Sequence, residues 1–144
     1  MTAEAKKIVT FAAFNNAGAA AYLEALIDYV HLVDDLHDRD NPEAGEAEHI
    51  AGILARWNHE LLFNPFVAAN RERLAALMEQ ALSCWVDSHS LPRGQERAAD
   101  VIKGQYHEIV FHVARLTGGW SHKRECERMF RDYDFEDVKT ANAA

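Results

Sequence analysis

The sequence predicts an all-α protein, a single-domain up-down bundle of about five helices. Apolar residues recur three and four positions apart along most of the chain, which is the spacing of one face of a helix. No stretch alternates apolar and polar residues as a half-buried strand would. The connections between the expected helices are short, which favours antiparallel neighbours and therefore an up-down arrangement.

The helix boundaries follow from prolines, glycines and capping residues. Pro42 and Pro65 each follow an asparagine, and Pro92 lies close behind a serine. We expect all three in the first turn of a helix, where proline is favoured. The pair Gly118-Gly119 predicts the end of a helix, and residues 15–18 are a candidate break in the first one. The expected helices span about residues 3–39, 42–62, 65–89, 92–117 and 121–132.

Four of these helices carry an apolar stripe that we expect to face the core. The stripe of the helix at 42–62 consists of Ile50, Ile53, Leu54, Trp57 and Leu61. We expect residues 1–136 to form the bundle and residues 137–144 to form a flexible tail.

Length, charge and cysteine content limit the classes of function. A chain of 144 residues with 49% apolar residues forms one domain with one core. A net charge of −8 argues against nucleic acid or an anionic membrane surface as a partner. No apolar run reaches the ~18 residues of a membrane span. Two distant cysteines, Cys84 and Cys126, exclude a disulfide scaffold and a four-cysteine zinc site, and they favour a cytoplasmic protein.

An acidic segment, DYVHLVDDLHDRDN, closes the first expected helix. His31, Asp34 and Asp38 share one face of that helix, with Asp35 beside them. Clustered carboxylates repel one another unless a cation neutralises them or one of them binds a proton. Carboxylate-rich sites suit Mg²⁺ or Mn²⁺, so these four residues are the predicted metal ligands. The alternative is a solvated helix end, with one or two aspartates capping the next helix.

The stretch YVHLVDDLHDRDN resembles the first aspartate-rich motif, DDxxD, of the trans-prenyl diphosphate synthases. In that all-helical family the motif binds Mg²⁺ that is bridged to a diphosphate. The matching residues are Asp34, Asp35 and Asp38, which the resemblance implies as ligands. The segment DYDFED, at residues 132–137, loosely resembles a second acidic motif. The resemblance is local, because NPEAG stands where the family has an arginine pair.

A polar stripe interrupts the apolar face of the helix at 92–117. It consists of Gln105, Glu108 and His112, at steps of three and four residues. If this stripe faces the acidic segment across the bundle, His112 and Glu108 are the candidate catalytic proton carriers. The alternative is that they are satisfied polar groups at the rim of the core.

Two functions are compatible with these patterns. The first is divalent-cation-dependent binding or turnover of a phosphorylated, diphosphate-bearing small molecule at the acidic helix. The second is a non-catalytic helical bundle that forms an oligomer or binds a partner protein. Four phenylalanines near helix ends could cover a neighbouring subunit: Phe11, Phe14, Phe63 and Phe66. A homodimer is expected under both functions.

Overall fold

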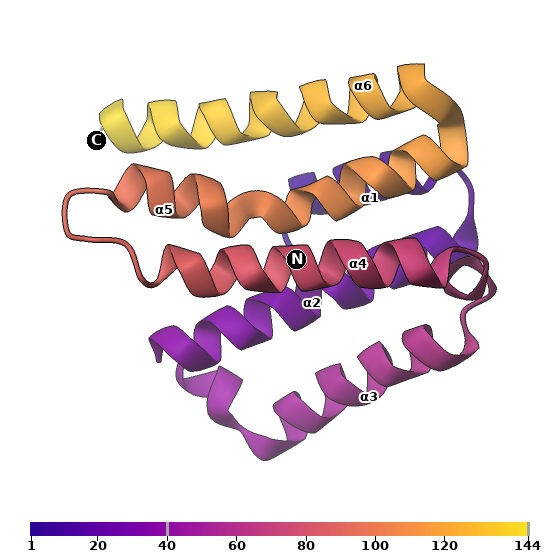
Figure 1. The fold of residues 1–144 in the computed structure, drawn as a ribbon, viewed down its shortest axis with the longest axis horizontal. Helices are drawn as coiled ribbons and strands as arrows, with labels where there is room; N and C mark the ends of the chain where they lie inside the picture. Colours follow the sequence, from indigo (N-terminus) through magenta and orange to yellow (C-terminus); the bar gives the residue numbers. More distant parts are fainter. Residues whose placement is uncertain (40, 144) are drawn as a thin grey trace.

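A computed structural model describes the backbone of residues 1–39 and 41–143 and the side chains of residues 1–39 and 41–132. Within these residues the chain is helical and contains no strand, so the predicted all-α bundle is confirmed. The elements lie roughly along one common axis (Figure 1). They are α1 (Ala3–Ala13), α2 (Ala17–Asp38), the 3₁₀ helix η1 (Pro42–Gly45), α3 (Ala47–Phe63), α4 (Pro65–Ser88), α5 (Glu96–Lys103), the 3₁₀ helix η2 (Gly104–Tyr106) and α6 (His107–Ala143).

Asparagine caps set three of the helix starts. The Asn16 side chain accepts a hydrogen bond from the backbone N–H of Ala19, and this cap separates α1 from α2 at the predicted break. Asn41 caps η1 in the same way, and Asn64 accepts from the N–H of Phe66 at the start of α4. The expected helix at 42–62 is therefore a short 3₁₀ turn followed by α3.

The expected single helix at 92–117 is wrong. Pro92 lies in a turn instead of a first helical turn, because the chain reverses at Gly94 with a φ of +90°. Helix α5 begins only at Glu96, whose carboxylate accepts a hydrogen bond from the Gly94 N–H. After Lys103 the short 3₁₀ turn η2 separates α5 from α6.

The predicted stop at Gly118-Gly119 is confirmed as a sharp bend. Gly119 has φ +88° and ψ −173°, and the arms of α6 on either side of it run in opposite directions (Figure 1). Beyond the bend the backbone is helical to Ala143. The flexible tail expected at 137–144 stays a prediction. The side chains of the acidic motif at 132–137, apart from Asp132, lie outside the described residues.

The core lies between α1, α2 and the first arm of α6. Val9, Leu26 and Ile109 are almost fully buried there, and alanines on α1 and α2 let the helices approach closely. Two hydrogen bonds hold α6 to the end of α1. The Thr117 hydroxyl donates to the Ala12 carbonyl oxygen at 2.6 Å, and His122 Nε2 lies 2.7 Å from the Phe11 carbonyl oxygen.

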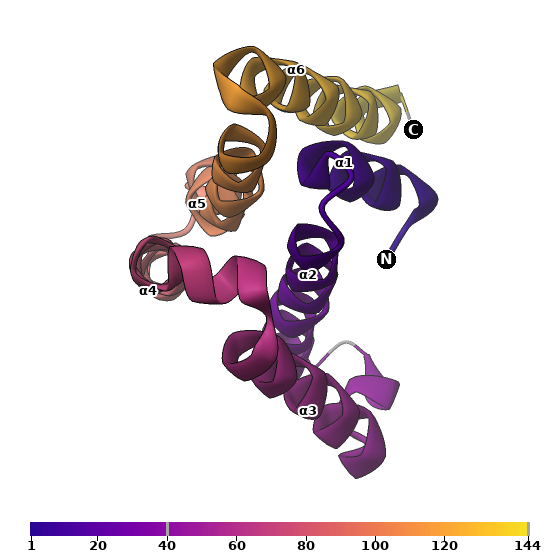
Figure 2. The same ribbon diagram turned by 90° about the vertical axis from the view of Figure 1, so that its right-hand side faces the viewer.

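Helix α3 is an outlying helix that packs against α2 and α4 at the edge of the bundle (Figure 2). Trp57 is the one residue of α3 that is buried, and its ring stacks on Tyr22 and Tyr29 of α2. Leu54 and Leu61 of the expected apolar stripe are instead 41% and 36% exposed. Helix α3 thus has apolar surface that its own chain does not cover.

His107 is half-buried at the start of α6. Its ring lies between those of Tyr106 and Phe130, with both centroid distances 4.1 Å. Burial, followed by the nearby charge of His31, lowers the pKa of His107 to about 4. The imidazole is therefore neutral at pH 7.

Replacing Gly119 tests the bend. Its backbone conformation is one that essentially only glycine adopts, and a new Cβ would meet no atom within 4 Å, so Gly119→Ala should cost about 1–3 kcal/mol through strain alone. Gly52 lies in α3 at an ordinary helical φ with equally open space, so Gly52→Ala should stabilise by about 0.5–1 kcal/mol. Urea unfolding of both variants measures these differences. Equal effects of the same sign in the two variants would contradict a strained, glycine-specific conformation at Gly119.

Lowering the pH should destabilise the fold through His107. Its pKa falls from 6.5 in the unfolded chain to about 4 in the fold, so between these values only the unfolded chain binds the proton. Stability is therefore lost as pH falls through this window, by roughly 2–3 kcal/mol at pH 4.5. Urea unfolding at pH 7 and 4.5 should show a smaller loss in His107→Phe, while Gly52→Ala retains the full loss. If His107→Phe lost as much stability between pH 7 and 4.5 as the wild type, His107 would not be the cause of the loss.

Candidate functional site

The carboxyl-terminal end of α2 carries the acidic segment and faces two other helices. Trp85 of α4 donates its indole N–H to Asp34 Oδ1 at 3.1 Å. The Lys103 ammonium, at the end of α5, lies 2.8 Å from the other oxygen, Asp34 Oδ2, and 3.9 Å from Asp38 Oδ2. Asp34 is half-buried on the side of α2 where an unpaired carboxylate would be costly. These contacts compensate it and join α2, α4 and α5.

The surroundings of Asp34 and Lys103 favour the charged form of both side chains. Burial raises the pKa of Asp34, but the hydrogen bonds from Lys103 and Trp85 and the charge of Lys103 outweigh it, so the pKa lies below its usual value. Burial likewise lowers the pKa of Lys103, and the pairing with Asp34 more than reverses this. Both groups are therefore charged at pH 7.

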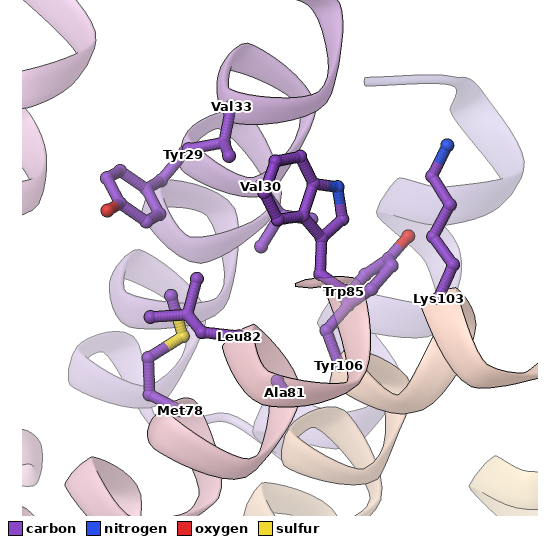
Figure 3. Close-up of a pocket in the computed structure, with 9 residues that line it drawn as sticks. All are labelled: Tyr29, Val30, Val33, Met78, Ala81, Leu82, Trp85, Lys103 and Tyr106. Carbon is purple, nitrogen blue, oxygen red and sulfur yellow. The ribbon is translucent and has the colours of Figure 1, made fainter. Parts of the chain in front are cut away.

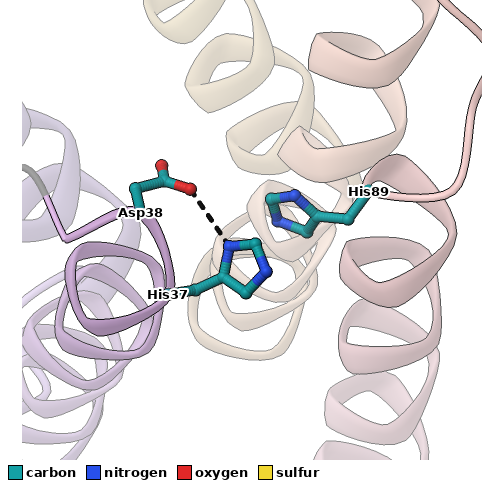
Figure 4. Close-up of side chains that lie close together, drawn as sticks. All are labelled: His37, Asp38 and His89. Carbon is teal, nitrogen blue, oxygen red and sulfur yellow. Dashed lines mark hydrogen bonds and ion pairs between the residues drawn. The ribbon is translucent and has the colours of Figure 1, made fainter.

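A compact group of possible metal ligands lies directly beside this ion pair. It consists of His37 and Asp38 at the end of α2 and His89 at the end of α4 (Figure 4). One ligand atom from each lies within 4.8 Å of the others, and His37 Nδ1 is 3.1 Å from Asp38 Oδ1. All three side chains are exposed. Among the described residues, no second group of three His, Cys, Asp or Glu side chains meets this spacing.

The Trp85 indole holds the two imidazoles in place. Its ring packs edge-on against those of His37 and His89, with centroid distances of 5.3 and 4.7 Å. The two imidazoles lie 4.1 Å apart, centroid to centroid. The hydrogen bond from Trp85 to Asp34 fixes the indole itself, so the ion pair with Lys103 indirectly positions the histidines.

Trp85 also lines a small apolar pocket (Figure 3). Val30, Val33 and Tyr29 of α2 form one wall, and Met78 and Leu82 of α4 form the opposite one. Lys103 and Tyr106 extend along the side nearest the ion pair. The pocket encloses only about 20 Å³, which is room for about one water molecule, so it cannot take up the apolar part of a ligand.

The structure brings only some of the predicted metal ligands together. Asp34 and Asp38 share Lys103, whereas Asp35 accepts a hydrogen bond from Asn41 Nδ2 at 3.3 Å. His31 is exposed and lines a different cavity, between α1, α2 and α6. The ammonium of Lys103 thus neutralises the charge of Asp34, a half-buried carboxylate that would otherwise be unpaired.

Three residues of this site, His89, Lys103 and Trp85, are not predicted as site residues by the sequence patterns. A usable signal for His89 was present, because in an up-down bundle the first and third helices end at the same side. The residues 37, 38 and 89, at the ends of the helices expected at 3–39 and 65–89, were therefore candidates for one cluster. No pattern in the sequence around Lys103 indicates that it pairs with Asp34, because the single helix expected at 92–117 has no end at that residue.

The two predicted proton carriers lie elsewhere on α6. Glu108 is exposed. His112 is half-buried, and burial, then the charges of Arg73, Lys123 and Arg115, lower its pKa. Its Nε2 atom is buried with no hydrogen-bond partner among the described residues. No hydrogen bond or ion pair in the described part of the chain joins either residue to the acidic segment.

Comparison of the chain with protein-family models, with curated proteins and with solved structures finds no match. The resemblance to the DDxxD motif therefore stays a prediction, and the geometry alone carries the functional argument. Each helix among the described residues is too short or too polar to cross a lipid bilayer.

Proposed function

We propose that the protein binds a divalent metal ion through His37, Asp38 and His89, and that the bound ion holds a phosphorylated small molecule. One observation carries the proposal: ligand atoms from two helices, distant in sequence, lie within 4.8 Å of one another. Three protein ligands leave coordination positions for water or a ligand oxygen, as at metal sites that bind substrates.

The donor atoms bear on which ion would bind. Two imidazole nitrogens and one carboxylate oxygen suit Mn²⁺ or Zn²⁺, whereas Mg²⁺ prefers oxygen ligands alone. Of the two ions expected from the sequence, Mg²⁺ and Mn²⁺, the donor set favours Mn²⁺. Zn²⁺ joins it as a candidate because His37 and His89 supply the nitrogen ligands that it favours.

The surroundings of the cluster favour an anionic ligand. Lys103 lies 3.9 Å from Asp38, so its ammonium can neutralise a second phosphoryl oxygen next to the ion. The ion would act as a Lewis acid toward the phosphoryl group.

A thermal melt with and without metal tests the site. With Mn²⁺ or Zn²⁺ at a hundredfold excess over the dissociation constant, Tm should rise by about 5–10 °C, and EDTA should reverse the rise. Mg²⁺ should give a smaller rise, and pyrophosphate should add to the rise only when metal is present. His89→Ala should abolish the metal-dependent rise, because it removes the α4 ligand.

Two further variants make this test specific. His59 is an exposed histidine next to an acid, 3.5 Å from Glu60, but no second histidine faces it, so His59→Ala should keep the full metal effect. Asp34→Asn weakens the link to Lys103 and should lower Tm with and without metal, leaving the metal-dependent rise. A rise that persists in His89→Ala, or no rise with any cation, would overturn the proposal.

A second candidate function is self-association through α3, and the uncovered apolar surface of that helix favours it. Leu62 and Phe63, at the end of α3, are 67% and 71% exposed, and Leu54 and Leu61 of the same helix are 41% and 36% exposed. Adjacent large apolar groups of this kind mark interaction surfaces. Of the other phenylalanines expected at an interface, Phe14 is exposed, while Phe11 and Phe66 pack against the core.

Measuring the molar mass by light scattering after gel filtration tests this candidate. The protein should elute as a dimer, and Phe63→Glu should shift it toward the monomer, because a charge would be buried without a partner. Val101→Glu is the matched control, since Val101 of α5 is also 67% exposed but lies outside α3 and α4. A monomeric wild type, or equal effects of both variants, would exclude a dimer through α3.

A further inference from the structure

A second cavity lies between α1, α2 and α6. Its volume is about 250 Å³. It is lined by Ile8 and Val9 of α1, Ile27 of α2, and Val110, Phe130 and His107 of α6. Thr2, Ala5, His31 and Tyr106 also line it. The cavity shares no residue with the group formed by His37, Asp38 and His89, although Tyr106 also lines the small pocket beside Trp85.

The size and polarity of the cavity limit what can occupy it. An apolar cavity of about 150 Å³ in a protein core accommodates benzene, so about 250 Å³ gives room for a two-ring or comparable aliphatic molecule. Among residues 1–39 and 41–132, whose side chains the structure describes, no aspartate, glutamate, lysine or arginine lines it. An ionised ligand would therefore lose its hydration without gaining an opposite charge, which excludes charged molecules from the interior.

His107 is the polar group in the wall whose ring is held between two aromatic side chains, while Thr2, His31 and Tyr106 are further polar groups of the lining. The His107 ring is fixed between Tyr106 and Phe130, and it packs so closely on Gly104 that a Cβ there would lie 3.3 Å from Nδ1. Burial keeps its pKa near 4, so at pH 7 the imidazole offers one donor and one acceptor. No hydrogen bond joins either ring nitrogen to another described residue, and neither nitrogen is both buried and unpaired, so a ligand can reach this hydrogen-bonding capacity.

We propose that this cavity is a binding site for an uncharged, largely apolar molecule of about two rings with one hydroxyl group that hydrogen-bonds to His107. The apolar lining contributes most of the affinity, because it removes the rings from water. The hydrogen bond to His107 contributes orientation and selectivity, because a ligand without the hydroxyl leaves the imidazole unpaired.

The probes for testing this site are 2-naphthol and naphthalene, which differ by one hydroxyl. Isothermal titration should show that both bind at pH 7, with 2-naphthol bound about tenfold more tightly. In His107→Phe, which keeps an aromatic ring between Tyr106 and Phe130, naphthalene should bind as before, and the advantage of 2-naphthol should disappear.

A cavity-filling variant locates the binding. Ala5→Phe places a ring in the cavity from α1 and should abolish binding of both probes, with the helical circular dichroism unchanged. Ala98→Phe, at an exposed position of α5, is the matched control and should bind both probes like the wild type. No binding of either probe to the wild type, or binding that survives in Ala5→Phe, would overturn the proposal. A tenfold preference that survives in His107→Phe would overturn the role of the imidazole.

Discussion

The charge of Asp34 is the constraint on which the organisation of this end of the molecule depends. A half-buried carboxylate is tolerated only when other groups compensate it, and here α4 supplies Trp85 while α5 supplies Lys103. Compensating the charge of Asp34 therefore fixes the relative positions of α2, α4 and α5. It also holds the Trp85 indole, against which His37 and His89 pack. The histidine pair and the apolar pocket are both consequences of this contact.

Much of the fold could be predicted because its signals are local. An asparagine cap acts within one turn, so Asn64 with Pro65 marks the start of α4 without any knowledge of the rest of the chain. Gly119 is equally local, because only glycine adopts its backbone conformation easily. The helix expected from Pro92 is wrong because Gly94, two residues later, adopts a positive φ and makes Pro92 part of a turn.

The site was less predictable because its contacts are distant in sequence. The acidic segment was recognisable, yet the cation paired with Asp34 lies 69 residues away, at the end of a helix that the pattern did not delimit. Helix α3 illustrates the same limit. Its apolar spacing correctly indicated a helix, but spacing cannot tell whether an apolar stripe faces the core or solvent, and only Trp57 became buried.

The bend at Gly119 determines when during synthesis the core can close. Helix α1 packs mainly against α6, and the hydrogen bond between Thr117 and Ala12 spans 105 residues. The apolar side of α1 thus leaves the ribosome long before its partner has been made. Until α6 has been made, that surface stays open to chaperones and to other nascent chains. Helix α1 can thus pack against α2 early in synthesis, but it acquires its main neighbour only much later.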